Sequence, residues 1–219
     1  MKKLIIGIIL VLGQKSFCGT VTYNDPSHFQ PYGQGSFSIS TDTNRLFNGE
    51  STIKISKSSG QYAGLFFNSV DPISRISYYQ YDEFGSSTPF YNYIFMYYTP
   101  NFSKWITWRD SGYGGTIGVE GGGDENYLPY GSLARSVGWH KIDAIVDDQY
   151  INFKIDDVAI GRATYTDPIF KVAFDISGGG GNVSYNIAQV TVQTVPEPSA
   201  LSLLAFGLGG LALVRRRRS

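Results

Sequence analysis

The residues best suited to recognising a ligand lie in one aromatic stretch, residues 104–113. This stretch holds Trp105, Trp108 and Tyr113, with Arg109 between the last two. Sugars present flat C–H faces that stack on exposed aromatic rings, and a guanidinium group donates hydrogen bonds to their hydroxyl groups. We therefore take these four residues as candidate glycan-binding residues. If the stretch is a strand, Trp105 and Trp108 point to opposite faces, so at least one of them is a core residue.

Residues for glycan cleavage are harder to find. Enzymes that cut glycans on a β-sandwich typically carry Glu-x-Asp-x-x-Glu on one strand, so that alternation aims the carboxylates into one cleft. The two histidines, His28 and His140, are far apart in sequence, and no Gly-x-Ser-x-Gly nucleophile motif is present. We predict that the protein is not an enzyme, and a glycan-active enzyme remains the third hypothesis. None of the body's glutamates begins the carboxylate pattern: Glu50, Glu83, Glu120 and Glu125.

Carboxylates in turns are the candidate metal ligands. Calcium needs several oxygens that converge from short spacings, which residues 124–126, 147–148 or 156–157 could supply. Solvated turn residues are the better interpretation, because Asp is common in turns for reasons of local hydrogen bonding. The single cysteine, Cys18, lies at the edge of the leader, so the body holds neither a disulfide nor a thiolate site. We predict no metal site and no cofactor, with Ca²⁺ as the one alternative.

Two glycine-rich runs, residues 112–123 and 178–181, raise the question of a phosphate-binding loop. Neither is followed by Gly-Lys-Ser/Thr, and no helical pattern follows that could lend its N-terminus to an anion. The three glycines after Glu120 favour a loop over a strand. We therefore predict that both runs are flexible loops.

The elements that must position these residues are predicted to be strands. Residues 141–146 and 150–155 both alternate, and the turn-like residues 147–149 lie between them. This pattern predicts an antiparallel hairpin with one dry and one wet side. The side chains expected to face the core are Ile151, Phe153 and Ile155.

Other segments follow the same period. Residues 51–57 alternate between apolar and polar, and in residues 183–192 the apolar parity switches near Ala188, which predicts a β-bulge. Residues 76–84 and 90–98 are aromatic on both parities, so we expect strands that are covered on both faces or that carry an adhesive outer face. Many short strands without helical spacing predict an all-β fold, a two-sheet antiparallel β-sandwich.

The stretch Gly138-Trp139-His140, followed by a strand, a turn and Phe153-Lys154-Ile155-Asp156, resembles the hairpin of laminin-G-like and concanavalin-A-like jelly rolls. Residues 47–51, which lead into a strand, also fit modules of that kind. The resemblance implies a single jelly-roll domain over residues 20–194. It transfers no catalytic or binding residue. We expect Trp139 to be buried at the end of the core with a structural role.

The N-terminal residues 1–19 have the layout of a secretory signal peptide. Lys2 and Lys3 precede the apolar run 4–13, and small or polar residues follow. The run is too short to span a bilayer. We therefore predict a signal helix that is removed on export.

The C-terminal residues 195–219 combine three features in a fixed order. Pro196, Glu197 and Pro198 precede the uncharged run 199–214, which is close to the length of a membrane helix. A basic cluster that resists translocation then ends the chain: Arg215, Arg216, Arg217 and Arg218.

This order resembles the PEP-CTERM sorting signal, a tail that some collections label the C-terminal domain of ice-binding proteins. The resemblance implies export, arrest in the membrane by a transmembrane helix over 199–214, and processing near Pro-Glu-Pro by an exosortase-type enzyme. It also implies a Gram-negative bacterium and a final place at the cell surface or in the extracellular matrix.

The net charge of the body excludes one class of partner. The whole chain has 18 Lys and Arg against 18 Asp and Glu, but residues 20–195 hold 11 basic and 17 acidic residues, a net charge of −6. An acidic body argues against nucleic acid, which requires basic residues to neutralise phosphates. The leading hypothesis is an exported, non-catalytic surface or matrix protein that binds polysaccharide. The alternative is a structural or adhesive protein that binds another protein.

Overall fold

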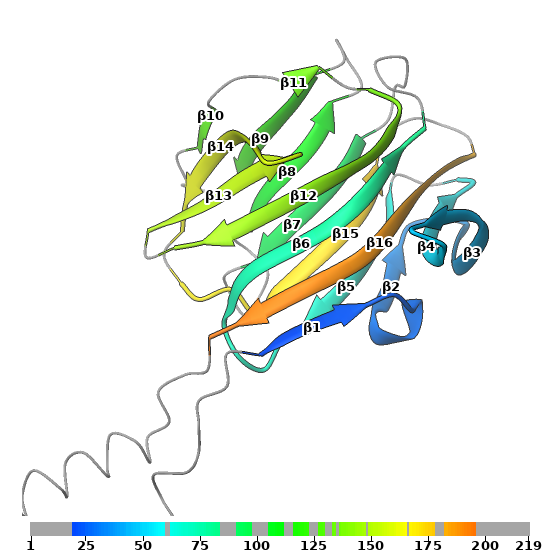
Figure 1. Ribbon diagram of the computed structural model, residues 1–219, viewed down its shortest axis with the longest axis horizontal. Helices are drawn as coiled ribbons and strands as arrows, with labels where there is room; N and C mark the ends of the chain where they lie inside the picture. The colour runs from blue at the N-terminus through cyan, green and yellow to red at the C-terminus, as the bar shows by residue number, and fades with distance from the viewer. Residues whose placement is uncertain are drawn as a thin grey trace, which may run out of the picture.

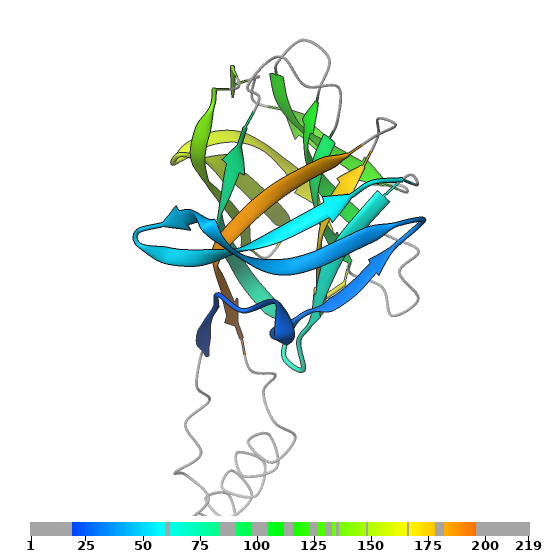
Figure 2. The same ribbon diagram turned by 90° about the vertical axis from the view of Figure 1, so that its right-hand side faces the viewer.

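The chain folds as a two-layer β-sandwich in which every strand pair is antiparallel (Figures 1 and 2). A computed structural model describes residues 19–59, 62–83, 91–97, 105–111, 116–122, 127–129, 133–134, 136–147, 149–165, 167–177 and 182–195. Within these ranges the only helix is one short 3-10 turn, Pro26–His28. The predicted all-β, two-sheet jelly-roll architecture is confirmed.

The first sheet has nine strands in the order β10-β14-β13-β12-β6-β16-β4-β3, with β1 paired to β16. Its long central strands β6 and β16 join the two halves of the sheet. The strand bounds are β1 Thr20–Tyr23, β3 Phe37–Phe47, β4 Glu50–Lys57, β6 Ile73–Asp82, β10 Tyr127–Pro129, β12 Gly138–Val146, β13 Tyr150–Ile155, β14 Val158–Thr164 and β16 Val183–Thr194.

The second sheet has seven strands in the order β11-β9-β8-β7-β15-β5-β2. It packs behind the first sheet in Figure 1. The bounds are β2 Gln30–Gly33, β5 Tyr62–Asn68, β7 Tyr91–Tyr97, β8 Trp105–Ser111, β9 Thr116–Gly122, β11 Leu133–Ala134 and β15 Lys171–Ser177.

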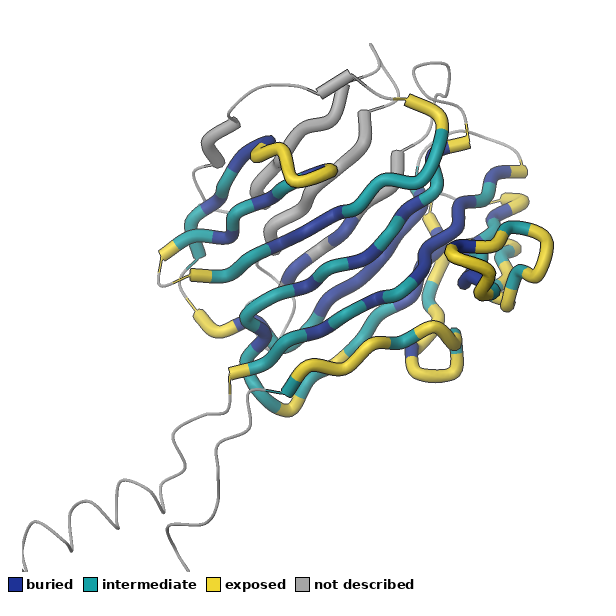
Figure 3. The backbone as a smooth tube through the Cα atoms, viewed as in Figure 1, coloured by how far each residue is buried: buried dark blue, intermediate teal, exposed yellow. Residues whose placement is uncertain are grey.

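The core lies between the sheets and follows from strand alternation. Figure 3 shows buried positions alternating with half-buried ones along the central strands. The hairpin β12–β13 pairs as predicted, and Asp147 begins its turn by accepting the backbone N–H groups of Gln149 and Tyr150. The three predicted core residues of this hairpin are fully buried: Ile151, Phe153 and Ile155.

The parity switch in β16 is a β-bulge, as predicted. The register with β6 shifts between Ala188 and Thr191, and Gln189 has a φ of 47°. The Gln189 N–H donates to the side-chain oxygen of Asn24 at 3.0 Å. One extra residue therefore lets both halves of β16 turn their apolar side chains toward the core.

The glycine-rich run 112–123 was predicted to be a loop, and this prediction is wrong for residues 116–122. These residues form β9, which pairs with β8 along its full length and with β11 at one end. Pairing with neighbouring strands outweighs the weak strand propensity of glycine, which depends on context. Residues 112–115 and 123 of this run, and the second run, 178–181, lie outside the described residues.

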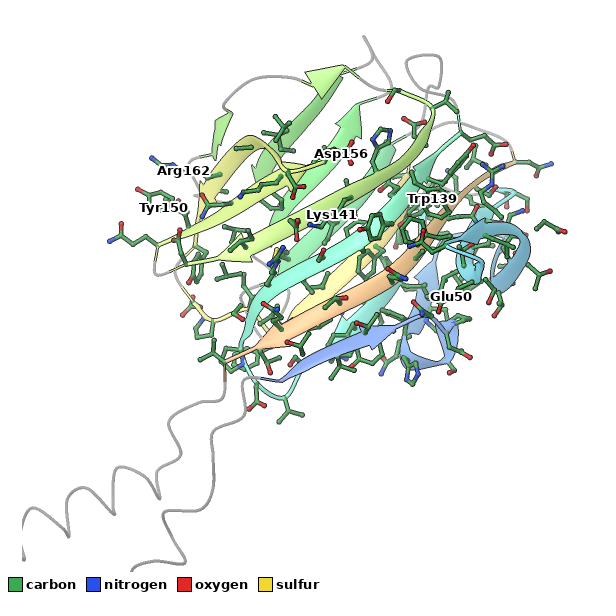
Figure 4. All side chains as sticks on the ribbon, viewed as in Figure 1. Glu50, Trp139, Lys141, Tyr150, Asp156 and Arg162 are labelled. Carbon is green, nitrogen blue, oxygen red and sulfur yellow. The ribbon has the colours of Figure 1, made fainter. Side chains whose placement is uncertain are left out.

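The expectation for Trp139 also needs correction, because this side chain lies on the outer face of the nine-stranded sheet and is only half-buried (Figure 4). Its neighbours on β12 alternate, so Ile142 points inward. The Trp139 ring packs at 5.3 Å from Tyr81 and 5.0 Å from Phe47, measured between centroids. The Arg45 guanidinium stacks on Tyr81 at 3.8 Å. This outer cluster holds the β3–β4 hairpin against the sheet.

Trp139→Ala should therefore lower the free energy of unfolding by about 2 kcal/mol, less than the roughly 3–5 kcal/mol typical of a fully buried aromatic residue. Urea denaturation measures the change. Tyr150→Ala, on the neighbouring strand β13, is a suitable comparison because its ring is in contact with the Arg162 guanidinium rather than with the cluster around Trp139. A loss of 4 kcal/mol or more at Trp139 would contradict its place on the outer face.

The beginning and the end of the described chain lie side by side at one end of the sandwich. β1 pairs with the last residues of β16, and the Thr194 N–H donates to the Gly19 carbonyl at 3.1 Å (Figure 1). Among the described residues, no helix is long and apolar enough to cross a membrane. The predicted signal helix over 1–19 lies outside the described residues except for Gly19. The predicted transmembrane helix over 199–214 and the sorting residues 196–198 and 215–218 also lie outside them.

Candidate functional site

The outer face of the seven-stranded sheet carries the candidate site. Along β15, Phe174 and Ile176 belong to the core, so Lys171 and Asp175 lie on the opposite face. Direct partners in an antiparallel pair share a face. The register therefore extends this outer face across the neighbouring strands, with Asp175 opposite Gly64 and Gly64 opposite Tyr32, and with Lys171 opposite Asn68.

Tyr32, Gly64 and Asp175 form a compact unit on this face. The Tyr32 ring lies directly over Gly64, because a Cβ added at Gly64 would be 2.8 Å from a ring carbon of Tyr32. The Tyr32 hydroxyl donates to Asp175 Oδ2 at 2.9 Å. Because Gly64 has no side chain, the Tyr32 ring can pack directly on the β5 backbone. The hydrogen bond to Asp175 then fixes the direction in which the Tyr32 hydroxyl points.

Further rings surround this unit, and we call Tyr32, Tyr62 and Phe66 the aromatic cluster. The Tyr32 centroid is 6.0 Å from that of Tyr62 and 6.0 Å from that of Phe66. Lys171 Nζ lies 3.8 Å from the Phe66 centroid, in cation–π contact. Tyr62 is 38% exposed, so the cluster reaches solvent.

Asp175 is unusual among the ionisable residues of the site because its carboxyl is buried, with only 4% of the residue exposed. Burial raises the pKa of its carboxyl to about 7, against the hydrogen bond from Tyr32 and the charge of Lys57, which both lower it. Asp175 Oδ1 is buried and has no hydrogen-bond partner in the structure's described part. Leaving a buried polar atom unpaired costs about 1–3 kcal/mol. Burial also lowers the pKa of Lys171.

The backbone register of β8 places the sequence-predicted residues in two alternating rows. The register pairs Trp105 with Tyr97, which pairs with Lys171, so Trp105 belongs to the outer face. By the same alternation Arg109 belongs to the outer face, in the row of Asp175. Trp108 pairs with the buried Ile94 and belongs to the core-facing row. The side chains of β8 and all of Tyr113 lie outside the described residues.

The turn carboxylates considered for Ca²⁺ have other partners where the structure describes them. Asp156 Oδ1 accepts the Lys141 N–H at 2.9 Å, and Oδ2 contacts His140 Nδ1 at 2.7 Å. Asp156 and Asp157 occupy the β13–β14 turn with φ values of 48° and 66°. No cluster of three metal-ligating side chains occurs among the described residues. Residues 124–126 and Asp148 lie outside them.

Comparison with known proteins identifies the tail. Residues 194–218 match the family model of the PEP-CTERM protein-sorting motif. The chain ends in a PEP-CTERM sorting signal. This signal implies an exported protein that an exosortase-type enzyme processes and that reaches the cell surface. No curated protein matches the chain.

Solved structures similar to this PEP-CTERM protein share its sandwich. The cellulose induced protein Cip1 superposes with a TM-score of 0.58 at 12% identity, covering 77% of this chain and 92% of its own. A Bacillus subtilis protein of unknown function with a galectin-like fold gives 0.56 at 12% identity, with 80% and 96% covered. A family 16 endo-glucanase from Bacteroides ovatus gives 0.55 at 11% identity, with 80% and 100% covered. At these identities the likeness establishes the fold alone.

Sequence reasoning missed the aromatic cluster and Asp175. Tyr62 and Phe66 occur at even spacing within one strand, so their common face was readable. Asp175 stands between Phe174 and Ile176, and a single carboxylate in an otherwise apolar strand is a further signal. Tyr32 gave none, because its partner Asp175 is 143 residues away in the sequence.

Proposed function

We propose that this PEP-CTERM protein is a non-catalytic surface or matrix protein that binds polysaccharide on the outer face of its seven-stranded sheet. The observation that carries the proposal is the aromatic cluster, which reaches solvent at Tyr62 and holds the Lys171 ammonium over the Phe66 ring. Rings and a few well-placed polar groups are the usual chemistry of sugar sites. The family signal and the fold, which lectin-like and glycan-active proteins share, support the same proposal.

The length of the site suits a polysaccharide segment of several sugars better than a single sugar. From β2 to β8 the outer face crosses five strands, which is about 19 Å at the usual strand spacing. Tyr32 stands at one end of this span and the position of Trp105 at the other. Stacking on rings at both ends, with Lys171 between them, suits an extended polysaccharide segment.

A glycan-active enzyme is a weaker proposal for this face. Asp175 has the raised pKa of a general acid, but cleavage needs a second carboxylate about 5–9.5 Å away. The register places Glu120 three strands from β15, about 14 Å across the sheet. This separation supports binding over hydrolysis. Adhesion to another protein remains the alternative use of the same surface.

Polysaccharide binding can be tested on a glycan array with residues 20–195. We expect binding, and we expect Tyr32→Ala and Trp105→Ala each to raise Kd about tenfold, or ~1.4 kcal/mol, because each removes a stacking ring. Tyr150→Ala is the matched control, since Tyr150 lies on the other sheet. Capture of a protein without any glycan would favour adhesion, and released sugars would favour an enzyme.

The place of the protein in the cell completes the proposal. The leader 1–19 starts export in a Gram-negative bacterium, and the run 199–214 holds the chain in the membrane until processing. The body, residues 20–194, is then delivered to the surface or the matrix. The positive-inside preference supports this orientation, since the basic residues 215–218 follow the apolar run.

A further inference from the structure

The sorting signal begins where the sandwich ends. The family match starts at residue 194, and Thr194 is the last residue of β16. The Val195 N–H donates to the Pro72 carbonyl at 2.8 Å, which holds the chain to the β5–β6 loop directly before Pro196. No spacer therefore separates the folded body from Pro196.

The residues before the signal belong to a folded strand, so they cannot enter the active site of a processing enzyme unless that strand unfolds. β16 pairs with β6, β4 and β1, and its side chains at Val190 and Val192 are 0% and 3% exposed. Peeling this strand away would open the middle of the nine-stranded sheet. The segment 196–198 spans at most about 10 Å when extended. An enzyme that cuts near it must therefore meet the folded surface around Val195.

That surface, which we call the tail pole, has the features of a docking site. Beside Val195 lies an open cavity of about 390 Å³. Val195 is 53% exposed and Val70, in the neighbouring β5–β6 loop, is 94% exposed. Asp71 follows Val70 and adds negative charge to this side of the pole. The lining of the cavity includes apolar groups of Pro72, Val146, Pro168 and Ile169, together with the carboxylates of Asp147 and Asp167.

We propose that the tail pole is the docking surface for the exosortase-type processing enzyme. This inference rests on the sorting function of the tail. The tail pole presents both apolar side chains and carboxylates. A complementary surface on the enzyme would therefore carry apolar side chains with basic groups beside them. The same carboxylates disfavour the anionic lipid surface as the partner.

The test uses the full chain in its own host, with processing followed by pulse-chase and C-terminal mass mapping. Val70→Lys combined with Pro168→Lys removes apolar contact and opposes a basic partner. We expect processing to slow about tenfold, or ~1.4 kcal/mol in the barrier. The matched control is Val137→Lys with Val158→Lys at the opposite pole, where the valines are 61% and 50% exposed. The control chain should be processed at the wild-type rate.

A second pair of chains separates docking from other causes. Ten Gly and Ser residues inserted between Val195 and Pro196 add about 17 Å of flexible reach, which frees the signal from the pole. With this spacer, chains with and without the Val70 and Pro168 substitutions should be processed equally fast. A difference that persists would overturn the docking role.

Three other results would also overturn it. Wild-type processing of the Val70 and Pro168 variant without the spacer would reject the inference while leaving the sorting function intact. Processing of the Val137 and Val158 control that slows to the same extent would assign the effect to added surface charge instead of docking. Failure of the wild-type chain to be processed at all would reject the sorting function itself.

Discussion

Gly64→Ala should lower the free energy of unfolding by about 3 kcal/mol and weaken polysaccharide binding about tenfold, as Tyr32→Ala does, because it displaces the same ring. A Cβ at this position would clash with the Phe174 carbonyl oxygen and would lie 2.8 Å from the Tyr32 ring. The carbonyl belongs to the backbone of β15, so it cannot turn away without disturbing the β5–β15 pair. Overpacking of this kind costs about 1–3 kcal/mol and occasionally more.

The two effects of this substitution can be measured separately. Urea denaturation reports the stability, and the glycan array reports binding under conditions where the variant remains folded. Gly33→Ala provides a graded control, because its nearest neighbour at 2.8 Å is the Phe37 ring, although the Tyr62 carbonyl lies at 3.0 Å. It should cost about 1 kcal/mol. Equal stability of wild type and Gly64→Ala would mean that Tyr32 does not rest on the β5 backbone.

The fold was predictable from the sequence wherever alternation was regular. The hairpin β12–β13 and the bulge at Gln189 both follow from counting apolar parity, because side chains alternate strictly along a strand. The same rule, applied to Trp139, would have placed it opposite Ile142 on the outer face. β9 could not be found this way, because its glycines carry no parity signal and its strand conformation depends on β8 and β11.

The site was less predictable than the fold because its residues meet through tertiary structure. Tyr32 and Asp175 lie on strands that come together only through β5, and Gly64 matters because a ring lies over it. The aromatic stretch 104–113 could be examined from sequence alone. Strand alternation indicated that Trp105 and Trp108 lie on opposite faces, so that they could not both bind the same glycan. The register then assigns Trp105 to the outer face.

Asp175→Asn should stabilise the protein by roughly 2–4 kcal/mol at pH 8 and leave it nearly unchanged at pH 4. The folded-state pKa of Asp175 is raised to about 7, whereas the ordinary value is 3.8. Each pKa unit corresponds to about 1.36 kcal/mol, so ionising this buried carboxyl costs the folded state about 4 kcal/mol above pH 7. The new amide offsets part of the gain, because its N–H groups need acceptors in a buried position.

The direction of the pH dependence follows from proton counting. Between pH 4 and 7 the folded chain keeps a proton on Asp175 that the unfolded chain releases, so this group makes stability fall as pH rises. The amide of the Asp175→Asn variant does not titrate, and the difference between the two proteins should therefore grow through this window and level off above pH 7. Urea denaturation at a series of pH values measures that difference directly.

Asp143 supplies the matched control on the other sheet, because it is also buried but fully partnered. Although burial raises the pKa of Asp143, its hydrogen bonds to Arg75 and Lys141 outweigh burial and lower it. A lowered pKa contributes stability above about pH 4 that is lost at lower pH. Asp143→Asn should thus destabilise the protein at pH 8, opposite in sign to Asp175→Asn. If both variants lost stability at pH 8, the folded protein would favour the charged form of Asp175, which would contradict its raised pKa.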